Sequence, residues 1–318
     1  MREKSELKPF DHQSTTTASA MAGNQHDQLS YEAASLANDT HYDNTSGSVR
    51  SGQFDHETTD GRTIFVGDAG TINGATDALD TGGNDRIIGT SQAETIAGDA
   101  ETIFDGHGGD DIIIGHGGGD TVYGDSVSMF GTSSGGDDVI TLNDHDSPVL
   151  VYGDAALAFG TLTGGDDTIT DGNGSSTIYG DFGTGEFDDG NDIIFGGGGN
   201  DQIIGGGGDD ILNGGSGADK LTGGSGQDAF VIETGTGYDL ISDFTTGDDI
   251  LDISDFGLTF ADLDTTSDNV IDGSDQFCTM DENTLIIDLG EASGGAVNTD
   301  YIQLTNVDQL VISDLGTA

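Results

Sequence analysis

Apolar and polar positions in the middle of the chain repeat every nine residues. Four ungapped units follow one another there: GGGGNDQII (196–204), GGGGDDILN (205–213), GGSGADKLT (214–222) and GGSGQDAFV (223–231). Each unit fits G-G-x-G-x-D-x-U-x, where U is a large apolar residue. Because side chains alternate along a strand, x-U-x predicts a three-residue strand with one inward side chain, and the six residues before it predict a turn.

The same register returns in less regular form from about residue 61. Units 106–114 and 115–123 carry His107 and His116 in the second glycine position, and unit 171–179 carries Ser176 in place of the aspartate. Four shorter fragments place Asp85, Asp138, Asp167 and Asp192 in the aspartate position. The side chains expected to face inward are those of Ile87, Ile113, Val122, Ile140, Ile169, Ile178, Ile194, Ile203, Leu212, Leu221 and Phe230.

A longer repeat is superimposed on the nonapeptides. The triplet Tyr-Gly-Asp occurs at 123–125, 152–154 and 179–181, and each copy precedes about ten residues without the glycine and aspartate pattern. We interpret each of these segments as a loop that leaves a continuous stack of repeats and returns to it.

Such short strands cannot stand alone, so successive units must stack and share a narrow core. Stacking places equivalent aspartates near one another, an arrangement that repels itself unless a cation lies between the carboxylates. The composition agrees, because the formal net charge is −52, 49 of the 59 acidic residues are aspartate, and only 33% of residues are hydrophobic. A chain of this kind tends to be disordered unless bound cations cancel the repulsion.

The charge also excludes classes of partner. After Arg86 the only basic residue besides histidine is Lys220, so little could neutralise nucleic-acid phosphates or attract an anionic membrane. No apolar run approaches the roughly 18 residues of a membrane span. The first residues lack the apolar segment of a secretory signal peptide. The single cysteine, Cys278, excludes an intramolecular disulfide and is expected to be a buried small apolar residue.

From about residue 61 to the end, the chain resembles the RTX (repeats-in-toxin) family, whose nonapeptide is the one described above. The resemblance implies an all-β fold, a right-handed parallel β-roll in which two nonapeptides make one turn. It further implies that Ca²⁺ lies between turn loops 18 residues apart and is bound by aspartate side chains and loop carbonyls. This pairs Asp192 with Asp210, Asp201 with Asp219, and Asp210 with Asp228.

The calcium ligands expected from this resemblance comprise the aspartates of the repeats and the glycines whose carbonyls line the turns. They are Asp111, Asp120, Asp138, Asp167, Asp192, Gly197, Gly199, Asp201, Gly206, Gly208, Asp210, Gly215, Gly217, Asp219, Gly224, Gly226 and Asp228. For the isolated upstream fragments, ordinary turn-forming aspartate is the alternative.

Three regions follow from these patterns: a disordered arm over 1–60, in which 29–37 could form a short helix, a calcium-binding β-roll over 61–232, and a cap over 233–318. Segment 237–257 resembles the one that closes RTX rolls in type I-secreted proteins. Segments 283–289, 300–307 and 310–315 are predicted strands, and a terminal repeat needs a cap unlike itself. The same resemblance implies an uncleaved export signal in the last fifty or so residues.

A twelve-residue stretch in the cap follows the spacing of an EF-hand calcium loop. Its candidate side-chain ligands are Asp264, Thr266, Asp268, Asp272 and Asp275. Two positions depart from the EF-hand pattern, because Asn replaces glycine at 269 and aspartate replaces glutamate at 275. The flanks 260–263 and 276–280 could be short helices, and an ordinary acidic turn stays the alternative.

Other chemistry is disfavoured. His56-Glu57 lacks the second histidine of a zinc protease motif, and His107 and His116 fall on opposite edges of a roll, where polar occupancy of a glycine position explains them better than a metal site. Ser133 sits in a G-x-S-x-G sequence, but within a predicted loop rather than a strand–turn–helix elbow. Paired aspartates such as Asp209 and Asp210 are explained by the repeat rather than by glycosidase chemistry.

We therefore expect a secreted, non-catalytic protein that folds on extracellular Ca²⁺ and acts as a structural, adhesive or matrix element. The expected partners are calcium, the type I secretion machinery and cell-surface or matrix polysaccharide, with no nucleic acid. An accessory or truncated form of an RTX protease or carbohydrate-active enzyme, and a pore-forming toxin, are the alternatives.

Overall fold

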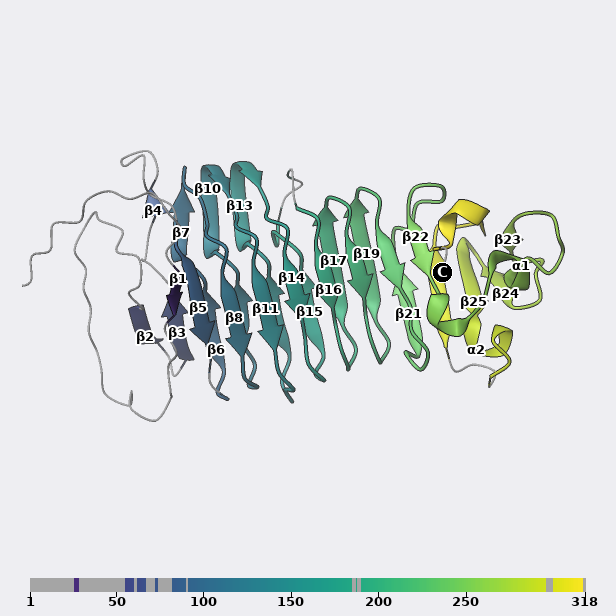
Figure 1. The fold of residues 1–318 in the computed structure, drawn as a ribbon, viewed down its shortest axis with the longest axis horizontal. Coiled ribbons are helices and arrows are strands. Elements are labelled where there is room, and N and C mark those ends of the chain that lie inside the picture. Colours follow the sequence, from purple (N-terminus) through teal and green to yellow (C-terminus); the bar gives the residue numbers. More distant parts are fainter. Residues whose placement is uncertain are drawn as a thin grey trace, which may run out of the picture.

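A computed structural model describes residues 82–316 except 90, 185–186, 188–189 and 296–299, together with the backbones of four earlier strands. Those four strands are β1 (His26–Gln28), β2 (Asp55–Thr59), β3 (Arg62–Val66) and β4 (Ile72–Asn73). The molecule is an elongated coil of short strands, closed by a cap at its C-terminal end (Figure 1).

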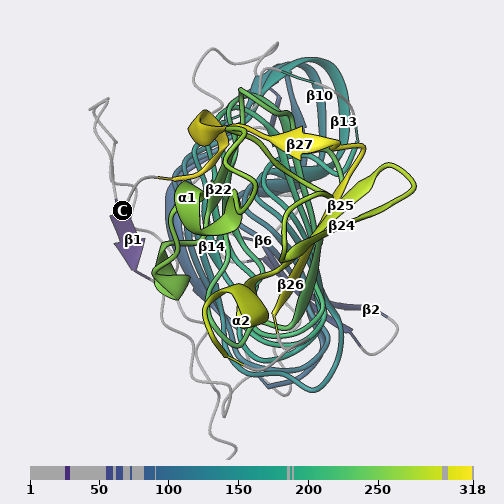
Figure 2. The ribbon, with the colours of Figure 1, turned by 90° about the vertical axis from the view of Figure 1, so that its right-hand side faces the viewer.

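Two long sheets form opposite walls of the coil (Figure 2). Sheet A is parallel throughout and contains, in order, β1, β5 (Asn84–Ile88), β8 (Ile112–Gly115), β11 (Val139–Leu142), β14 (Thr168–Thr170), β16 (Ile193–Phe195), β18 (Ile211–Asn213), β20 (Ala229–Val231) and β22 (Ile250–Asp252). Sheet B contains β2, β3, β6 (Glu94–Ala97), β9 (Thr121–Tyr123), β12 (Val149–Tyr152), β15 (Ser176–Tyr179), β17 (Gln202–Gly207), β19 (Lys220–Ser225) and β21 (Tyr238–Ile241), followed by the three strands of the cap. These stacked parallel sheets confirm the predicted β-roll.

A third parallel sheet corrects the prediction of loops after the first two Tyr-Gly-Asp triplets, whereas the described residues after the third triplet contain no strand before β16. Sheet C contains β4, β7 (Ala100–Phe104), β10 (Ser126–Ser134) and β13 (Ala155–Thr163). Strands β10 and β13 begin one residue after the triplets at 123–125 and 152–154 and pair along their length. A small apolar cluster holds this sheet, with Ile103, Met129 and Leu162 buried in it.

The coil therefore changes along its length. Equivalent positions of sheet A are 25 to 29 residues apart in the N-terminal part, where each turn has room for a strand of sheet C. From Asp192 to Asp228 the spacing falls to 18 and the turn consists of two nonapeptides. The described molecule is thus a three-sheet coil continued by a two-sheet roll.

All eleven side chains predicted to face inward are 0% exposed. Strand register stacks them in rows, so that Ile140 lies between Ile113 and Ile169, and Leu212 lies between Ile194 and Phe230. Burying a side chain of this size contributes roughly 1.5–3 kcal/mol to folding. The narrow core of the roll is therefore the one that the nonapeptide pattern predicts.

The cap extends sheet B. Strand β26 (Tyr301–Thr305) runs parallel to β21, and β25 (Thr284–Asp288) and β24 (Cys278–Asp281) add antiparallel beside it. The remaining cap elements are short: η1 (Ser254–Phe256), α1 (Phe260–Leu263), β23 (Ile271–Asp272), α2 (Leu289–Ala292), β27 (Gln309–Leu310) and η2 (Ile312–Asp314). Two of the predicted cap strands, within 283–289 and 300–307, are present.

Two predictions for the cap are wrong. Of residues 310–315 only Leu310 lies in a strand, β27. The strand ends there because the buried Asp314 carboxylate accepts hydrogen bonds from the N–H groups of Val311 and Gly247 and closes a 3₁₀ turn. The flank 276–280 leads into strand β24 rather than a helix, because residues 278–281 pair with β25.

The predicted disordered arm over 1–60, with its helix at 29–37, lies outside the described residues apart from β1 and β2. For these two strands the prediction is wrong, because β1 pairs with β5 and β2 pairs with β3. Pairing at the edge of a sheet uses backbone groups and needs no apolar side-chain pattern, so the sequence carries little signal for it.

Candidate calcium sites

An aspartate ladder runs along sheet A. One aspartate precedes each strand from β8 to β22, and Asp85 lies within β5. From Asp85 to Asp228, the backbone N–H of each donates to Oδ1 of the aspartate one turn later, over 2.6–3.1 Å. The members of the sheet A ladder are Asp85, Asp111, Asp138, Asp167, Asp192, Asp210, Asp228 and Asp249. The sixth position of the nonapeptide thus directs every carboxylate to the neighbouring turn.

A second, interrupted ladder precedes the strands of sheet B. Glu94 donates its N–H to Asp120, Asp201 donates to Asp219, and Asp219 donates to Asp239. The two turns between Asp120 and Asp201 carry Val149 and Ser176 at this position.

One carboxylate oxygen of many ladder members lies in the interior without a hydrogen-bond partner. Among the described residues these include Oδ2 of Asp111, Asp138, Asp167, Asp192, Asp201 and Asp219. Burying a charged oxygen without a partner is costly, so such groups are normally neutralised or bound to metal. Aspartate oxygens are the ligands that Ca²⁺ prefers, at 2.3–2.6 Å.

Glycines let further oxygens approach these carboxylates. A Cβ atom added at Gly205 would lie 2.1 Å from Asp210 Oδ2 and 2.7 Å from the Gly223 carbonyl oxygen. The space that a side chain would fill is therefore bordered by two oxygens, as an oxygen-coordinated cation requires. All eight glycines predicted as carbonyl ligands have φ between 82° and 148°, which only glycine adopts at no steric cost: Gly197, Gly199, Gly206, Gly208, Gly215, Gly217, Gly224 and Gly226.

Burial changes the acidity of the ladders. It raises the pKa of Asp192 to about 9, that of Asp201 to about 8 and that of Asp228 to about 7. Burial, reinforced by neighbouring carboxylates, also raises the pKa of Asp138 and Asp167 well above the usual range. In the absence of a cation the folded ladders therefore take up protons, and Ca²⁺ must displace those protons to bind.

A family model, the RTX calcium-binding nonapeptide repeat, matches the chain at residues 73–102, 102–127, 162–184, 188–221, 195–230 and 204–241. These matches fall on the turns that carry the two ladders. The chain carries RTX calcium-binding repeats. It is thus a calcium-binding RTX-repeat protein, and the RTX resemblance of the sequence is confirmed.

Among solved structures, the chain is similar to the AlgE6R3 subunit of the Azotobacter vinelandii mannuronan C5-epimerase. The two chains share 22% identity over 48% of this chain and 78% of that one, with a TM-score of 0.25. No curated protein matches the sequence. Within the part of the chain that is described, no helix has the length and apolar character of a membrane span.

The structure places the aspartates paired by the RTX resemblance next to each other. Asp192 contacts Asp210 at 2.8 Å, Asp201 contacts Asp219 at 2.8 Å and Asp210 contacts Asp228 at 3.1 Å, in each case from a backbone N–H to Oδ1. Upstream, Asp111, Asp138 and Asp167 continue the sheet A ladder, and Asp120 belongs to the sheet B ladder. Their role as calcium ligands stays a prediction.

A comparison of Asp210→Asn with Asp209→Asn separates the role of an RTX aspartate as a calcium ligand from the effect of its charge alone. Both changes remove one charge from the same turn, and asparagine keeps the oxygen that accepts a backbone hydrogen bond, from Asp192 at position 210 and from Gln227 at position 209. Asp210 is buried whereas Asp209 is exposed. We expect Asp210→Asn to raise the Ca²⁺ midpoint of folding about tenfold or more, which corresponds to loss of a charged ligand, and Asp209→Asn to change it little. Equal shifts in a circular dichroism titration would mean that overall charge, not position, governs binding.

The EF-hand-like stretch is held by its own hydrogen bonds. Asp264 accepts the N–H groups of Asp268 and Asn269, and Asp275 accepts those of Thr266 and Asp272. Asn269 has φ of 71°, the conformation that the EF-hand pattern reserves for glycine. Only the preceding flank is helical, as α1. Among the described residues the acidic side chains of this loop do not form a three-carboxylate group, and its role as a calcium site stays a prediction.

Other predicted residues have ordinary surroundings. His107 contacts Ser134, and His116 contacts Asn143. Ser133 lies in strand β10, not in a loop, and its hydroxyl donates to the Phe130 carbonyl. Cys278 is buried as predicted, and burial raises the pKa of its thiol to about 12.

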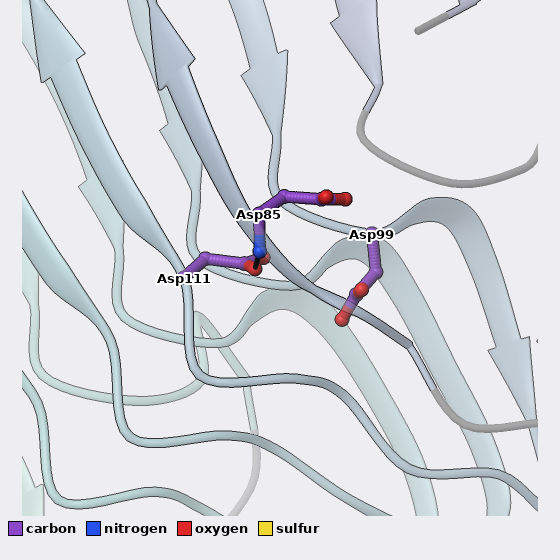
Figure 3. Close-up of side chains that lie close together, drawn as sticks. All are labelled: Asp85, Asp99 and Asp111. Carbon is purple, nitrogen blue, oxygen red and sulfur yellow. Dashed lines mark hydrogen bonds between the residues drawn. The ribbon is translucent and has the colours of Figure 1, made fainter. Parts of the chain in front are cut away.

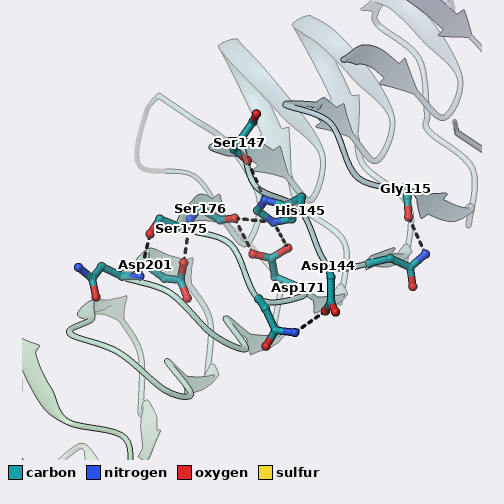
Figure 4. Close-up of polar contacts among 11 residues, drawn as sticks. Gly115, Asp144, His145, Ser147, Asp171, Ser175, Ser176 and Asp201 are labelled. Atoms are coloured by element: carbon teal, nitrogen blue, oxygen red, sulfur yellow. Dashed lines mark hydrogen bonds and ion pairs between the residues drawn. The ribbon is translucent and has the colours of Figure 1, made fainter. Parts of the chain in front are cut away.

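Where the sheet B ladder lacks its aspartates, a buried histidine is found that sequence reasoning missed (Figure 4). His145 Nδ1 lies 2.7 Å from the Ser147 carbonyl oxygen, and Nε2 lies 3.0 Å from Asp171 Oδ1. Each ring nitrogen thus lies within hydrogen-bonding distance of an acceptor oxygen, an arrangement that suits an imidazole with a proton on both nitrogens. Ser176 Oγ completes the group by donating to Asp171 Oδ2. A buried histidine–aspartate pair thus occupies a turn in which the repeat offers fewer carboxylates.

Replacing His145 should destabilise the coil. His145→Ala leaves the Asp171 carboxylate buried without its partner, and breaking a buried ion pair in this way costs about 3 kcal/mol. His116→Ala is the matched control, because His116 is exposed. Urea unfolding at saturating Ca²⁺ measures both variants. Unchanged midpoints for His145→Ala would show that the imidazole is not needed.

Proposed function

We propose that this calcium-binding RTX-repeat protein is exported unfolded, folds when it meets extracellular Ca²⁺, and acts without catalysis as an adhesive or matrix element that binds polysaccharide. The observation that carries the proposal is the sheet A ladder, in which buried carboxylates of successive turns face one another. Such an interior becomes stable only when something neutralises it, so the folded state depends on the surroundings of the chain.

Calcium concentration supplies the switch. Extracellular calcium-binding modules bind Ca²⁺ with dissociation constants on the order of 10⁻⁴–10⁻³ M, so sites of this affinity are empty in the cytosol and filled outside the cell. Because the sites form only in the folded coil, the free energy of binding is also free energy of folding. With a net charge of −52 the calcium-free chain repels itself and stays extended, a state suited to passage through a type I secretion channel.

The exposed face of sheet C supports an adhesive role. Strand register aligns Phe104, Phe130 and Phe159 in one row, and the side chains of Phe104 and Phe159 are 41% and 57% exposed. The rings of Phe130 and Phe159 are parallel within 9°, with centroids 5.7 Å apart. Thr132 and Thr161 pair with each other and form the next row on this face. Their hydroxyls can form hydrogen bonds to the hydroxyls of a bound molecule.

A row of flat aromatic faces beside hydroxyl groups matches the alternating C–H faces and hydroxyls of a sugar chain. Exposed aromatic rows of this kind usually mark an interaction surface. The large negative charge favours an uncharged polysaccharide over an anionic one, because like charges repel across an interface.

A binding screen tests the proposal. The full-length chain with 5–10 mM Ca²⁺, or roughly ten times the expected dissociation constants, is tested against immobilised uncharged and anionic polysaccharides, with EGTA as the calcium-free arm. We expect calcium-dependent retention on an uncharged polysaccharide, lost in Phe159→Ala. Phe195→Ala is the control, since Phe195 is 40% exposed on sheet A instead. No retention on any polysaccharide, or equal retention of both variants, would refute the adhesive role.

A further inference from the structure

The outer face of sheet A carries a continuous apolar strip. The first and third residues of its short strands point outward, and strand register aligns them in two rows along the coil (Figure 1). Five large apolar side chains of these rows are 37–43% exposed: Val139, Ile193, Phe195, Ile211 and Ile250. We define the apolar strip by the two rows between β8 and β22, which are Ile112, Val139, Thr168, Ile193, Ile211, Ala229 and Ile250, and Ile114, Thr141, Thr170 and Phe195.

The apolar strip contains no acidic residue, although 59 of the 318 residues of the chain are acidic. The ladder carboxylates lie on the other side of the sheet, where they are buried. There they come together in groups of three, namely Asp85, Asp99 and Asp111 (Figure 3), and Asp154, Asp167 and Asp181. Aligned apolar side chains on a surface that is otherwise rich in carboxylates indicate an interaction surface.

A row of exposed residues, most of them aspartate, borders the apolar strip on one side. Each member precedes a ladder aspartate, and from Asp137 to Gln227 the backbone N–H of each donates to a side-chain oxygen one turn earlier. We call this row the acidic border: Asp110, Asp137, Asp166, Asn191, Asp209, Gln227 and Asp248. On the opposite side, strands of the two-sheet roll lead into the glycine-rich turns 196–199 and 214–217. In the roll, a partner on the strip would therefore face carboxylates along one edge only.

The dimensions of the apolar strip decide which kind of partner fits. Seven strands about 4.8 Å apart make it roughly 29 Å long, and three residues per strand make it roughly 10 Å wide. Its area of roughly 300 Å² is far below the roughly 800 Å² per partner of a stable interface between folded proteins. A second copy of this chain would therefore bind weakly, and the charge of −52 on each copy opposes it. An α-helix is about 10–12 Å across, which matches the width, and about 19 helical residues match the length.

We propose that the apolar strip binds an amphipathic α-helix of a partner protein, whose apolar face is flanked on one side by lysine or arginine. The apolar face of the helix covers side chains such as Ile193 and Ile211, a mode of recognition that many helix-binding proteins use. One helical turn rises about 5.4 Å, close to the spacing of about 4.8 Å between turns of the coil, so basic residues at every third or fourth position run alongside the acidic border. An anionic helix or an anionic membrane lacks this complementarity.

Binding of a synthetic peptide to the full-length chain tests the proposal. Saturating Ca²⁺ keeps the chain folded, and about 150 mM NaCl screens charges more than about 8 Å apart. The probe is an amphipathic peptide of about 20 residues with leucine on one face and lysine along one flank. Its controls are a scrambled peptide of the same composition and a peptide with glutamate in place of lysine. We expect fluorescence anisotropy to show that the probe binds about tenfold more tightly than either control, because only the probe has both the apolar face and the basic flank.

Two lysine variants separate the apolar strip from the charge of the whole chain. Ile211→Lys and Ile204→Lys change the net charge equally, but Ile211 points outward from sheet A and Ile204 points outward from sheet B. We expect Ile211→Lys to weaken binding of the probe about tenfold or more, and Ile204→Lys to change it by less than about twofold. In the acidic border, Asp209→Asn should weaken binding about two- to fivefold, as loss of an exposed ion pair does. Asp144→Asn, exposed on the opposite side of the strip, should leave binding unchanged.

Equal binding of the probe and the scrambled peptide, or equal weakening by the two lysine variants, would mean that charge alone attracts the probe, and the proposal would be wrong. It would also be wrong if the glutamate peptide bound as tightly as the probe, because the acidic border would then play no part. Should Ile211→Lys fail to fold by circular dichroism, Val139→Lys replaces it, since Val139 is exposed in the same row. None of these results depends on polysaccharide binding, which is assigned to sheet C.

Discussion

In EGTA the full-length chain should be largely unfolded, and β structure should appear cooperatively as Ca²⁺ is added. The sheet A ladder stacks a carboxylate in every described turn, and each of these carboxylates is buried. Desolvation and mutual repulsion of ionised groups at this spacing outweigh what the narrow apolar core contributes. The transition should have a midpoint on the order of 10⁻⁴–10⁻³ M Ca²⁺ and be followed by far-ultraviolet circular dichroism.

Magnesium at the same concentration is the control for this titration, because it screens charge equally but requires a tighter octahedral site. It should restore little structure. A spectrum with full β content in EGTA at neutral pH would contradict the expected coupling between binding and folding.

Acid should partly replace calcium. Some aspartates have a higher pKa in the folded chain than in the unfolded chain. Their protonation stabilises the fold fully when the pH is below the pKa of the unfolded chain, near 4, and this contribution is lost as the pH rises through the pKa of the folded chain. Burial places those folded values at about 7 for Asp228, about 8 for Asp201 and about 9 for Asp192. In EGTA we therefore expect β structure at pH 4–5 that disappears between about pH 6 and 9.

Circular dichroism at a series of pH values in EGTA measures this effect. Analytical ultracentrifugation at each pH separates folding from aggregation, because the isoelectric point is near 4.1. With saturating Ca²⁺ the same chain should stay folded at pH 8. A calcium-free chain whose β content increases from pH 5 to pH 8 would show that the ladders do not take up protons in the folded state.

The two-sheet roll could be predicted from the sequence residue by residue. The nine-residue period is unbroken from 196 to 231, so each position has one structural role: an inward side chain such as Leu212, a turn glycine such as Gly206, or a ladder aspartate such as Asp210. In a regular repeat every turn has the same length, so the spacing of two residues in the sequence shows whether they are neighbours in the fold.

The three-sheet part could not be predicted in this way. Its turns vary from 25 to 29 residues, so the spacing between Asp154 and Asp167 does not indicate that their carboxylates meet. Strands β10 and β13 contain many small residues, and the inward positions Met129 and Ala158 contrast little with their neighbours. The aspartates of the Tyr-Gly-Asp triplets did leave a signal, since Asp125, Asp154 and Asp181 are followed 11 to 13 residues later by Asp138, Asp167 and Asp192, but only the fold explains it. His145 left none.

The direction of the ladder hydrogen bonds gives the two ends of the coil unequal tolerance to truncation. In sheet A the buried N–H of each turn is satisfied by the carboxylate of the turn that follows it in the chain, from Asp85 to Asp249. Cutting turns away at the N-terminal end exposes carboxylate oxygens, which water solvates readily. Cutting at the C-terminal end removes the acceptor of a buried donor, so the last remaining turn is left incomplete. The coil is therefore built to be completed from its C-terminal end, with each finished turn serving as the template for the turn before it in sequence.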